Sequence, residues 1–187
     1  MTDGGRSMGE NSRKMAVGGM MVALAVAVML LGGVIPVATF CCPALAGLLL
    51  LPVLFECGKR VALGAYVAIA ALSVLLGPDK EAALLFAFVG WYPVAKWDLE
   101  KLGNRWLRRA LKVVLLNGAI ALMYALVFFV LRLDQIMADY ADMTRAMLIA
   151  FVVLGNFSLF FYDRLLSIMA VVYVAKLRPR LFGHGAK

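Results

Sequence analysis

The sequence predicts an all-α integral membrane protein, a single bundle of six transmembrane helices. Three observations carry this prediction. Of the 187 residues, 64% are apolar, whereas soluble domains carry about 45–50%. Only 16% are charged, and the mean hydropathy is +0.92. A soluble fold of this size has too little interior to hide so much apolar surface.

Six apolar runs are candidates to cross a hydrocarbon core of about 30 Å as helices. In chain order they are 15–36, 41–57, 61–77, 82–96, 111–131 and 146–175. We expect three parts in the chain: a flexible polar cytoplasmic tail at 1–14, the transmembrane domain at 15–177, and a basic cytoplasmic tail at 178–187.

Some prolines lie at the ends of these runs, and others lie inside them, where they interrupt helical hydrogen bonding. Pro36, Pro43 and Pro78 lie at or just beyond run ends, where proline is tolerated. Pro52 and Pro93 lie inside runs. They predict kinks, and neighbouring helices must then satisfy the freed backbone groups.

Whether the chain has six spans or five depends on whether the fourth run crosses the membrane. As a helix, 82–96 would be only about 22 Å long, so a re-entrant segment is the alternative. With six spans and both termini in the cytoplasm, fifteen of the 19 Lys and Arg residues lie inside. The positive-inside rule therefore favours six spans in the plasma membrane, with outer turns near 37–40, 78–81 and 132–145.

The net charge of +8 predicts an anionic partner. The basic residues lie between the apolar runs, above all in Lys96–Lys112, so anionic lipid explains them better than nucleic acid. Lys80 and Lys96 are expected to snorkel toward the membrane surface. We expect no nucleic-acid partner.

The sequence contains few residues or motifs suited to catalysis. His184 is the only histidine and lies in the basic tail. No His/Cys/Asp cluster has metal-ligand spacing, and neither a nucleophile elbow nor a phosphate-binding loop occurs. Cys41, Cys42 and Cys57 are expected to be reduced. We therefore expect no enzymatic activity, no catalytic residues, no metal, no cofactor and no ATP hydrolysis by this chain.

Small residues recur along the first run. Gly19, Ala23 and Ala27 lie at i, i+4 and i+8, which places them on one helix face where another backbone can approach closely. This face is either an interface for a partner helix or a packing surface within the chain itself.

Polar and aromatic residues in the outer third of the bundle form a candidate pocket for a small, polar, partly aromatic metabolite. They are Thr39, Phe40, Lys80, Glu81, Tyr124, Phe128, Arg132, Arg145 and Asn156. An interfacial belt of aromatic residues and snorkelling cations is the alternative. Asp79 is also expected to cap a helix that starts at Lys80.

Asp163 and Arg164 lie deep in the last run, where a charge is costly unless it is paired or hydrated. Either they are structural, through ion pairs or contact with the basic loop, or they serve coupling or gating.

The whole pattern resembles the substrate-binding S components of energy-coupling factor (ECF) vitamin transporters. The resemblance covers about residues 14–180 and includes K-M-A-V-G-G-M-M-V-A-L-A-V-A-V-M at Lys14–Met29. It implies that the stripe Gly19, Ala23 and Ala27 packs on a coupling transmembrane subunit, which works with ATPase subunits. It also implies a vitamin-like substrate bound near the outer surface.

The same broad fold is similar to that of rod-shape-determining membrane proteins, which are scaffolds without a solute. A non-transporting membrane scaffold is therefore the alternative function.

Overall fold

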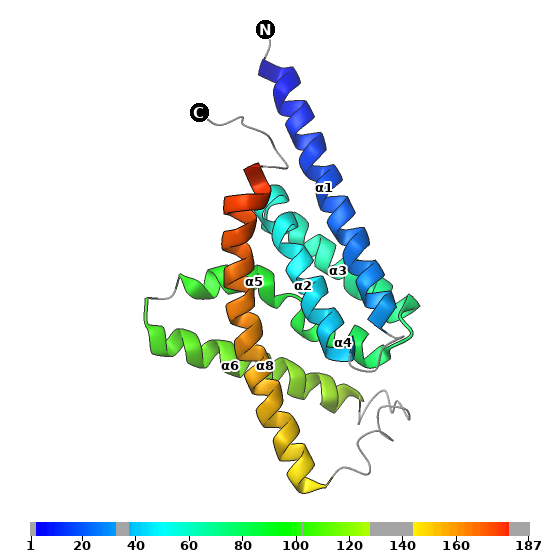
Figure 1. Ribbon diagram of the computed structural model, residues 1–187, viewed down its shortest axis with the longest axis vertical. Helices are drawn as coiled ribbons and strands as arrows, with labels where there is room; N and C mark the ends of the chain where they lie inside the picture. The colour runs from blue at the N-terminus through cyan, green and yellow to red at the C-terminus, as the bar shows by residue number, and fades with distance from the viewer. Residues whose placement is uncertain (1–2, 33–37, 102, 128–143, 180–187) are drawn as a thin grey trace. The chain divides into compact units, whose positions relative to one another are not determined.

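The computed structural model describes residues 3–32, 38–101, 103–127 and 144–179, and every regular element in these ranges is helical (Figure 1). By length and composition, five helices within them are able to cross a membrane. These are Lys14–Leu31, Ala38–Cys57, Lys59–Leu76, Arg105–Leu126 and Arg145–Leu177. The prediction of an all-α chain is confirmed, and the helices are compatible with a multi-pass membrane protein.

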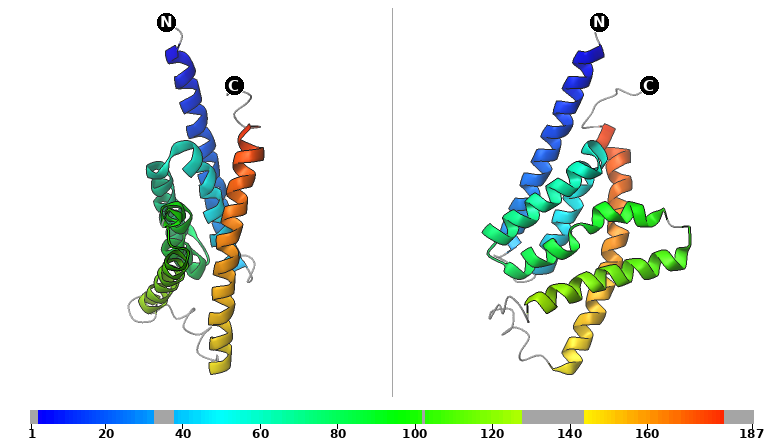
Figure 2. Two further views of the ribbon diagram at one scale, coloured as in Figure 1. Left: turned by 90° about the vertical axis from the view of Figure 1, so that its left-hand side faces the viewer. Right: turned by 180° about the vertical axis from the view of Figure 1, so that it is seen from behind.

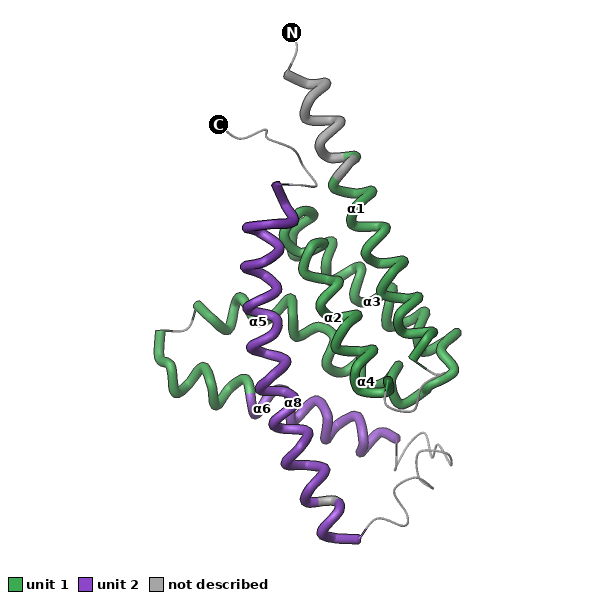
Figure 3. The backbone as a smooth tube through the Cα atoms, in the orientation of Figure 1, with its two compact units in different colours: residues 1–112 green, residues 113–187 purple. Residues whose placement is uncertain are grey.

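The chain divides into two compact units, Met1–Lys112 and Val113–Lys187, which are coloured separately in Figure 3. Helix α6 (Arg105–Leu126) begins in the first unit and ends in the second. Each unit is described by itself below.

Helix α2 (Ala38–Cys57) is the centre of the first unit. It contacts α1 (Asp3–Leu31), α3 (Lys59–Leu76), α4 (Lys80–Val89) and α5 (Tyr92–Glu100). Figures 1 and 2 show α1, α2 and α3 running side by side.

The core of this unit lies between α1, α2, α3 and α4. Its buried members are Ala25, Met29, Cys42, Ala46, Leu50, Ile69, Ala82 and Phe86. Three of the eight are alanines, which let the helix backbones approach closely, as helices packed in lipid require.

Helices α1 and α2 both begin earlier than the sequence predicts. Helix α1 starts at Asp3, so most of the tail expected to be flexible is helical. A helix already formed in the apolar part propagates at little cost per residue. Helix α2 starts at Ala38, which places Pro43 inside the helix rather than at its end. Pro52 also lies inside α2.

The fourth apolar run is broken, as Pro93 predicts. Helix α4 ends at Val89, Gly90 and Trp91 form a turn, and Pro93 lies in the first turn of α5. Proline has no N–H to continue the helix, so α4 cannot run on into α5 without losing a hydrogen bond.

Side chains satisfy two carbonyls at this break. The Tyr66 hydroxyl of α3 donates to the Ala87 carbonyl oxygen. The Trp91 indole N–H donates to the Phe88 carbonyl oxygen at 2.6 Å. Such partners allow a helix to be interrupted within a membrane.

The second unit contains the rest of α6, α8 (Arg145–Val172) and a π-helical turn, Tyr173–Leu177. Helix α6 starts six residues before the predicted run because Asn104 caps it: its side-chain oxygen accepts from the Trp106 N–H at 3.0 Å.

Candidate functional site

The predicted outer end of the first unit is organised around Asp79. The Thr39 hydroxyl donates to Asp79 Oδ2 at 2.7 Å. Asp79 Oδ1 accepts from the Ala82 N–H at 2.9 Å, so Asp79 is the N-cap of α4, as predicted. The start of α2 and the start of α4 therefore lie together.

The other predicted site residues of this unit surround the same turn. Lys80 is exposed and donates from Nζ to the Val74 carbonyl oxygen at 2.9 Å, which ties it to the end of α3. Phe40 is 46% exposed, and Glu81 is half-buried. The structure thus brings Thr39 together with the Asp79–Glu81 turn.

The remaining predicted site residues belong to the second unit or lie outside the described residues. Tyr124 is half-buried and Arg145 is exposed at the start of α8. Phe128 and Arg132 lie outside the described residues. A pocket that draws on both units stays a prediction.

Asn156 is held by a partner that the site prediction did not include. Its Nδ2 donates to Asn117 Oδ1 at 3.1 Å, and Asn117 Nδ2 donates back to Asn156 Oδ1 at 2.8 Å. The signal in the sequence is two amides in apolar runs, but only the structure pairs them. Farther along α8, Asp163 is half-buried and Arg164 is exposed.

The small-residue stripe of α1 is exposed. Gly19, Ala23 and Ala27 all lie on the accessible side of the helix, and a Cβ added at Gly19 meets no atom within 4 Å. The buried glycine is its neighbour Gly18, where an added Cβ would lie 3.1 Å from Cys57 Sγ. Helix α1 therefore packs on α2 through a different face.

The other end of α2 carries an ion-pair cluster centred on Asp98. Lys59, two residues after α2, donates to Asp98 Oδ2. Lys101 Nζ lies 3.0 Å from Asp98 Oδ1. Hydrogen bonds from Lys59 and then Lys101 lower the pKa of the Asp98 carboxyl below its usual range.

A second cluster joins α5 to α6 through Glu100. Lys112 Nζ lies 3.1 Å and Lys96 Nζ 3.6 Å from Glu100 Oε1. Arg108 Nη1 donates to the Glu100 carbonyl oxygen at 3.3 Å. The Lys96 side chain is 0% exposed, so the expectation that it snorkels is wrong. The carboxylate one helical turn later provides an ionic partner instead.

Segment α4–α5 connects the two ends of α2. Its start is bonded to Thr39, at the beginning of α2, and its end is bonded to Lys59, just after α2. The 20 residues of α2 rise about 30 Å. The broken fourth run therefore extends from one end of this central helix to the turn at the other.

Within the described residues, no three His, Cys, Asp or Glu side chains are grouped so that they could hold a metal ion. Comparison of the chain with protein-family models, curated proteins and solved structures finds no match.

Proposed function

We propose that this protein is a membrane-embedded substrate-binding subunit for uptake of a vitamin-like small molecule, as its resemblance to S components implies. A separate coupling module, with a transmembrane subunit and ATPase subunits, supplies the energy. In this proposal the chain crosses the plasma membrane six times and keeps both termini in the cytoplasm.

The path of α4–α5 supports six crossings. A re-entrant segment would return to the end of α2 from which it started. Instead, the contacts with Thr39 and Lys59 lie at opposite ends of α2. The interruption at Gly90 and Trp91 divides this run into two short helices, α4 and α5.

The exposed stripe on α1 is the observation that carries the proposal. Gly19, Ala23 and Ala27 make no packing surface for α2 or α3, because the buried face of α1 runs through Gly18, Ala25 and Met29. Small exposed residues allow the close backbone approach that helix association in lipid uses. This face is available to a coupling subunit.

In this proposal the substrate binds at the end of the bundle that carries Thr39 and Asp79. Phe40 supplies exposed aromatic surface there, and Lys80 and Glu81 supply charge of both signs. Hydroxyl or amide groups of the substrate would form hydrogen bonds with Thr39 or Asp79 in place of the Thr39–Asp79 hydrogen bond.

A scaffold function is the second candidate. The observation that favours it is the internal pairing of polar groups at the candidate site: Asp79 uses both carboxylate oxygens, and Asn156 is paired with Asn117. A scaffold resembling rod-shape-determining proteins has no solute to bind.

Mass spectrometry of the purified chain separates the two functions. We expect the denatured sample to release a small molecule that is absent from a mock purification. In cells that hold a coupling module, Ala23→Leu should abolish co-purification of the coupling subunit and leave the small molecule bound. Ala71→Leu on the exposed side of α3 is the matched control. A folded chain that carries no small molecule in any preparation would instead support the scaffold.

A further inference from the structure

The carboxylates around the α5–α6 connection are already occupied by lysines. Asp98 is paired with Lys59 and Lys101. Glu100 is paired with Lys112 and lies near Lys96. Each of these four lysines therefore has a carboxylate partner within the protein, shared with one other lysine.

The three arginines at the start of α6 are not compensated in this way. Arg105, Arg108 and Arg109 have no carboxylate within ion-pair distance among the residues that the structure describes. Arg108 donates to a carbonyl oxygen, that of Glu100, rather than to a carboxylate. The spacing i, i+3 and i+4 places the three guanidinium groups on one side of the helix.

The helix itself adds to this positive field. The first turn of α6 contains no acidic residue, and the N-terminal end of a helix carries a partial positive charge. A run of cations at this end opposes the helix dipole. An external anion would stabilise both the helix end and the arginines.

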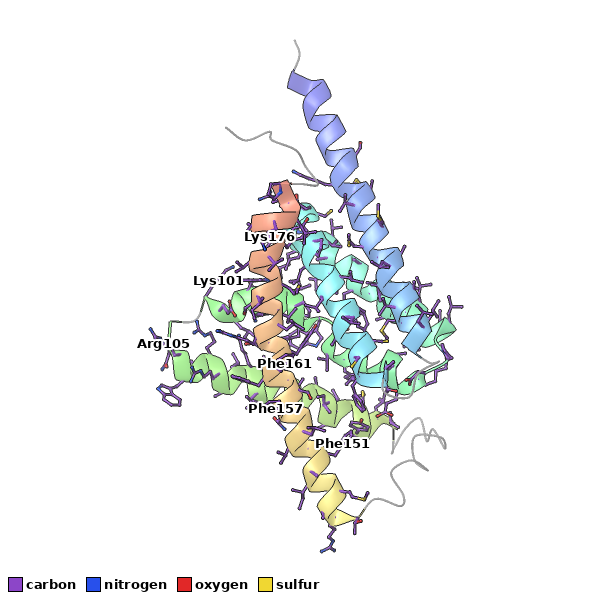
Figure 4. All side chains as sticks on the ribbon, viewed as in Figure 1. Lys101, Arg105, Phe151, Phe157, Phe161 and Lys176 are labelled. Atoms are coloured by element: carbon purple, nitrogen blue, oxygen red, sulfur yellow. The ribbon has the colours of Figure 1, made fainter. Side chains whose placement is uncertain are left out.

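An exposed aromatic side chain flanks the arginine side of the helix. Trp106 is 78% exposed and lies about 100° around the helix from Arg105. The Arg109 guanidinium lies 6.0 Å from the centre of the Trp106 ring. Farther along the same helix, Val113 and Val114 are exposed as well. Figure 4 labels Arg105 at the start of α6, beyond Lys101 at the end of α5.

We propose that the start of α6 binds the phosphate of an anionic phospholipid through Arg105, Arg108 and Arg109, with Trp106 against the upper acyl chains. Guanidinium groups bind phosphate oxygens in pairs of hydrogen bonds. Tryptophan prefers the boundary between headgroups and hydrocarbon. A phospholipid offers an anion and an apolar tail to the same turn of helix.

The site differs from the proposed substrate site and does not depend on it. It includes neither Thr39 nor Asp79, and it uses no residue of the α1 stripe. Lipid retention and small-molecule release can be measured on the same purified sample, so failure of one proposal leaves the other standing.

Native mass spectrometry of the full chain tests the proposal. The protein is reconstituted in nanodiscs of phosphatidylcholine mixed equally with phosphatidylglycerol, then released in mild detergent. We expect bound phosphatidylglycerol on the wild-type protein. Arg105→Gln with Arg109→Gln should lower its retention on the order of tenfold, because each cation near an anionic surface contributes to binding.

Two further variants separate recognition from net charge. Arg60→Gln with Arg178→Gln removes the same charge from exposed positions elsewhere and should leave retention unchanged. Arg105→Lys with Arg109→Lys keeps the charge but loses the paired hydrogen bonds, and should give intermediate retention. Equal losses in the two glutamine pairs, or full retention in the lysine pair, would overturn the proposal.

Soluble phosphate distinguishes the lipid from a free anion. Inorganic phosphate and glycerol phosphate should not displace phosphatidylglycerol, because they lack the acyl chains that contact Trp106. Displacement by inorganic phosphate alone would assign the arginines to a soluble anion and refute the lipid site.

Discussion

Asn117 and Asn156 form a reciprocal amide pair that joins α6 to α8. Each Nδ2 donates to the Oδ1 of the other residue, at 2.8 and 3.1 Å. Each Nδ2 also donates to the carbonyl oxygen four residues earlier, that of Val113 at 2.9 Å and that of Val152 at 3.0 Å. Both N–H bonds of both amides are therefore used between two apolar helices.

Replacing either amide should weaken the α6–α8 contact. We expect Asn117→Ala to destabilise the protein by about 1 kcal/mol, the range of hydrogen bonds between membrane helices. Asn156→Ala should cost a similar amount, and the double variant little more than either single one, because the three proteins lack the same pair. Thermal unfolding in detergent measures this, and fully additive losses would contradict the pairing.

The Thr39–Asp79 bond predicts a specific sensitivity at the start of α4. Thr39→Val keeps the shape of the side chain and removes the donor, so we expect a loss of about 1 kcal/mol in the free energy of unfolding. Asp79→Ala should cost more, because the helix also loses its cap. Thr144→Val is a control, since the exposed Thr144 hydroxyl makes no capping bond to the α8 backbone and donates instead to Met147 Sδ at 3.3 Å, a weak acceptor. Equal effects of Thr39→Val and Thr144→Val would contradict the prediction.

The Asp98 cluster predicts a dependence on pH. Lys59 and Lys101 lower the pKa of Asp98 in the folded protein. The stabilisation is therefore present above the unfolded-state pKa and is lost as the pH falls through the folded-state pKa. Thermal stability of wild type and Asp98→Asn should differ at neutral pH and converge in acid. The difference should also shrink at high salt, because these side chains are exposed. A difference that persists in acid would exclude the charge of Asp98 as its source.

Leucine substitutions at the neighbouring glycines Gly18 and Gly19 of α1 should have different effects on stability. Gly18→Leu forces a side chain against Cys57 and should destabilise the fold by about 1–3 kcal/mol, as overpacking does. Gly19→Leu enters open space and should leave stability unchanged while it blocks a coupling partner. Unfolding curves and co-purification separate these effects. Loss of stability at Gly19 alone would reverse the assignment of faces.

Single cysteines in a cysteine-free background test the proposed orientation. Labels at Thr39, Lys80 and Asp139 should react with an impermeant reagent from outside, and labels at Lys59 and Arg105 only after the membrane is opened. Asp139 lies outside the described residues. Labelling of Arg105 in intact cells would contradict the orientation. Reaction of Thr39 and Lys80 on different sides would contradict the Thr39–Asp79 hydrogen bond, because Lys80 directly follows Asp79.

Local chemistry made some features predictable from sequence. The cap at Asp79 and the break before Pro93 each follow from one residue and its immediate neighbours, and both are confirmed. The position of Gly18 in the packed face was not predictable, because α1 is apolar on all sides from Met15 to Leu31 and adjacent residues differ by only about 100°.

Features that depend on distant residues were also missed. The burial of Lys96 depends on how α5 packs, and its ionic contact with Glu100 replaces the membrane surface that snorkelling assumes. Asn117 and Asn156 are 39 positions apart, so no local pattern relates them. The pocket, the substrate and the orientation remain predictions.

The interruption between α4 and α5 also has a mechanical consequence. At this interruption the Tyr66 phenol donates to the Ala87 carbonyl oxygen, and the Trp91 indole donates to the Phe88 carbonyl oxygen. Side-chain hydrogen bonds of this kind can shift with a change of angle at Gly90. Segment α4–α5 can bend at this interruption. The Tyr66 hydrogen bond to Ala87 makes the angle of the bend depend on the position of α3. A displacement of α3 would be transmitted to the turn that carries Asp79.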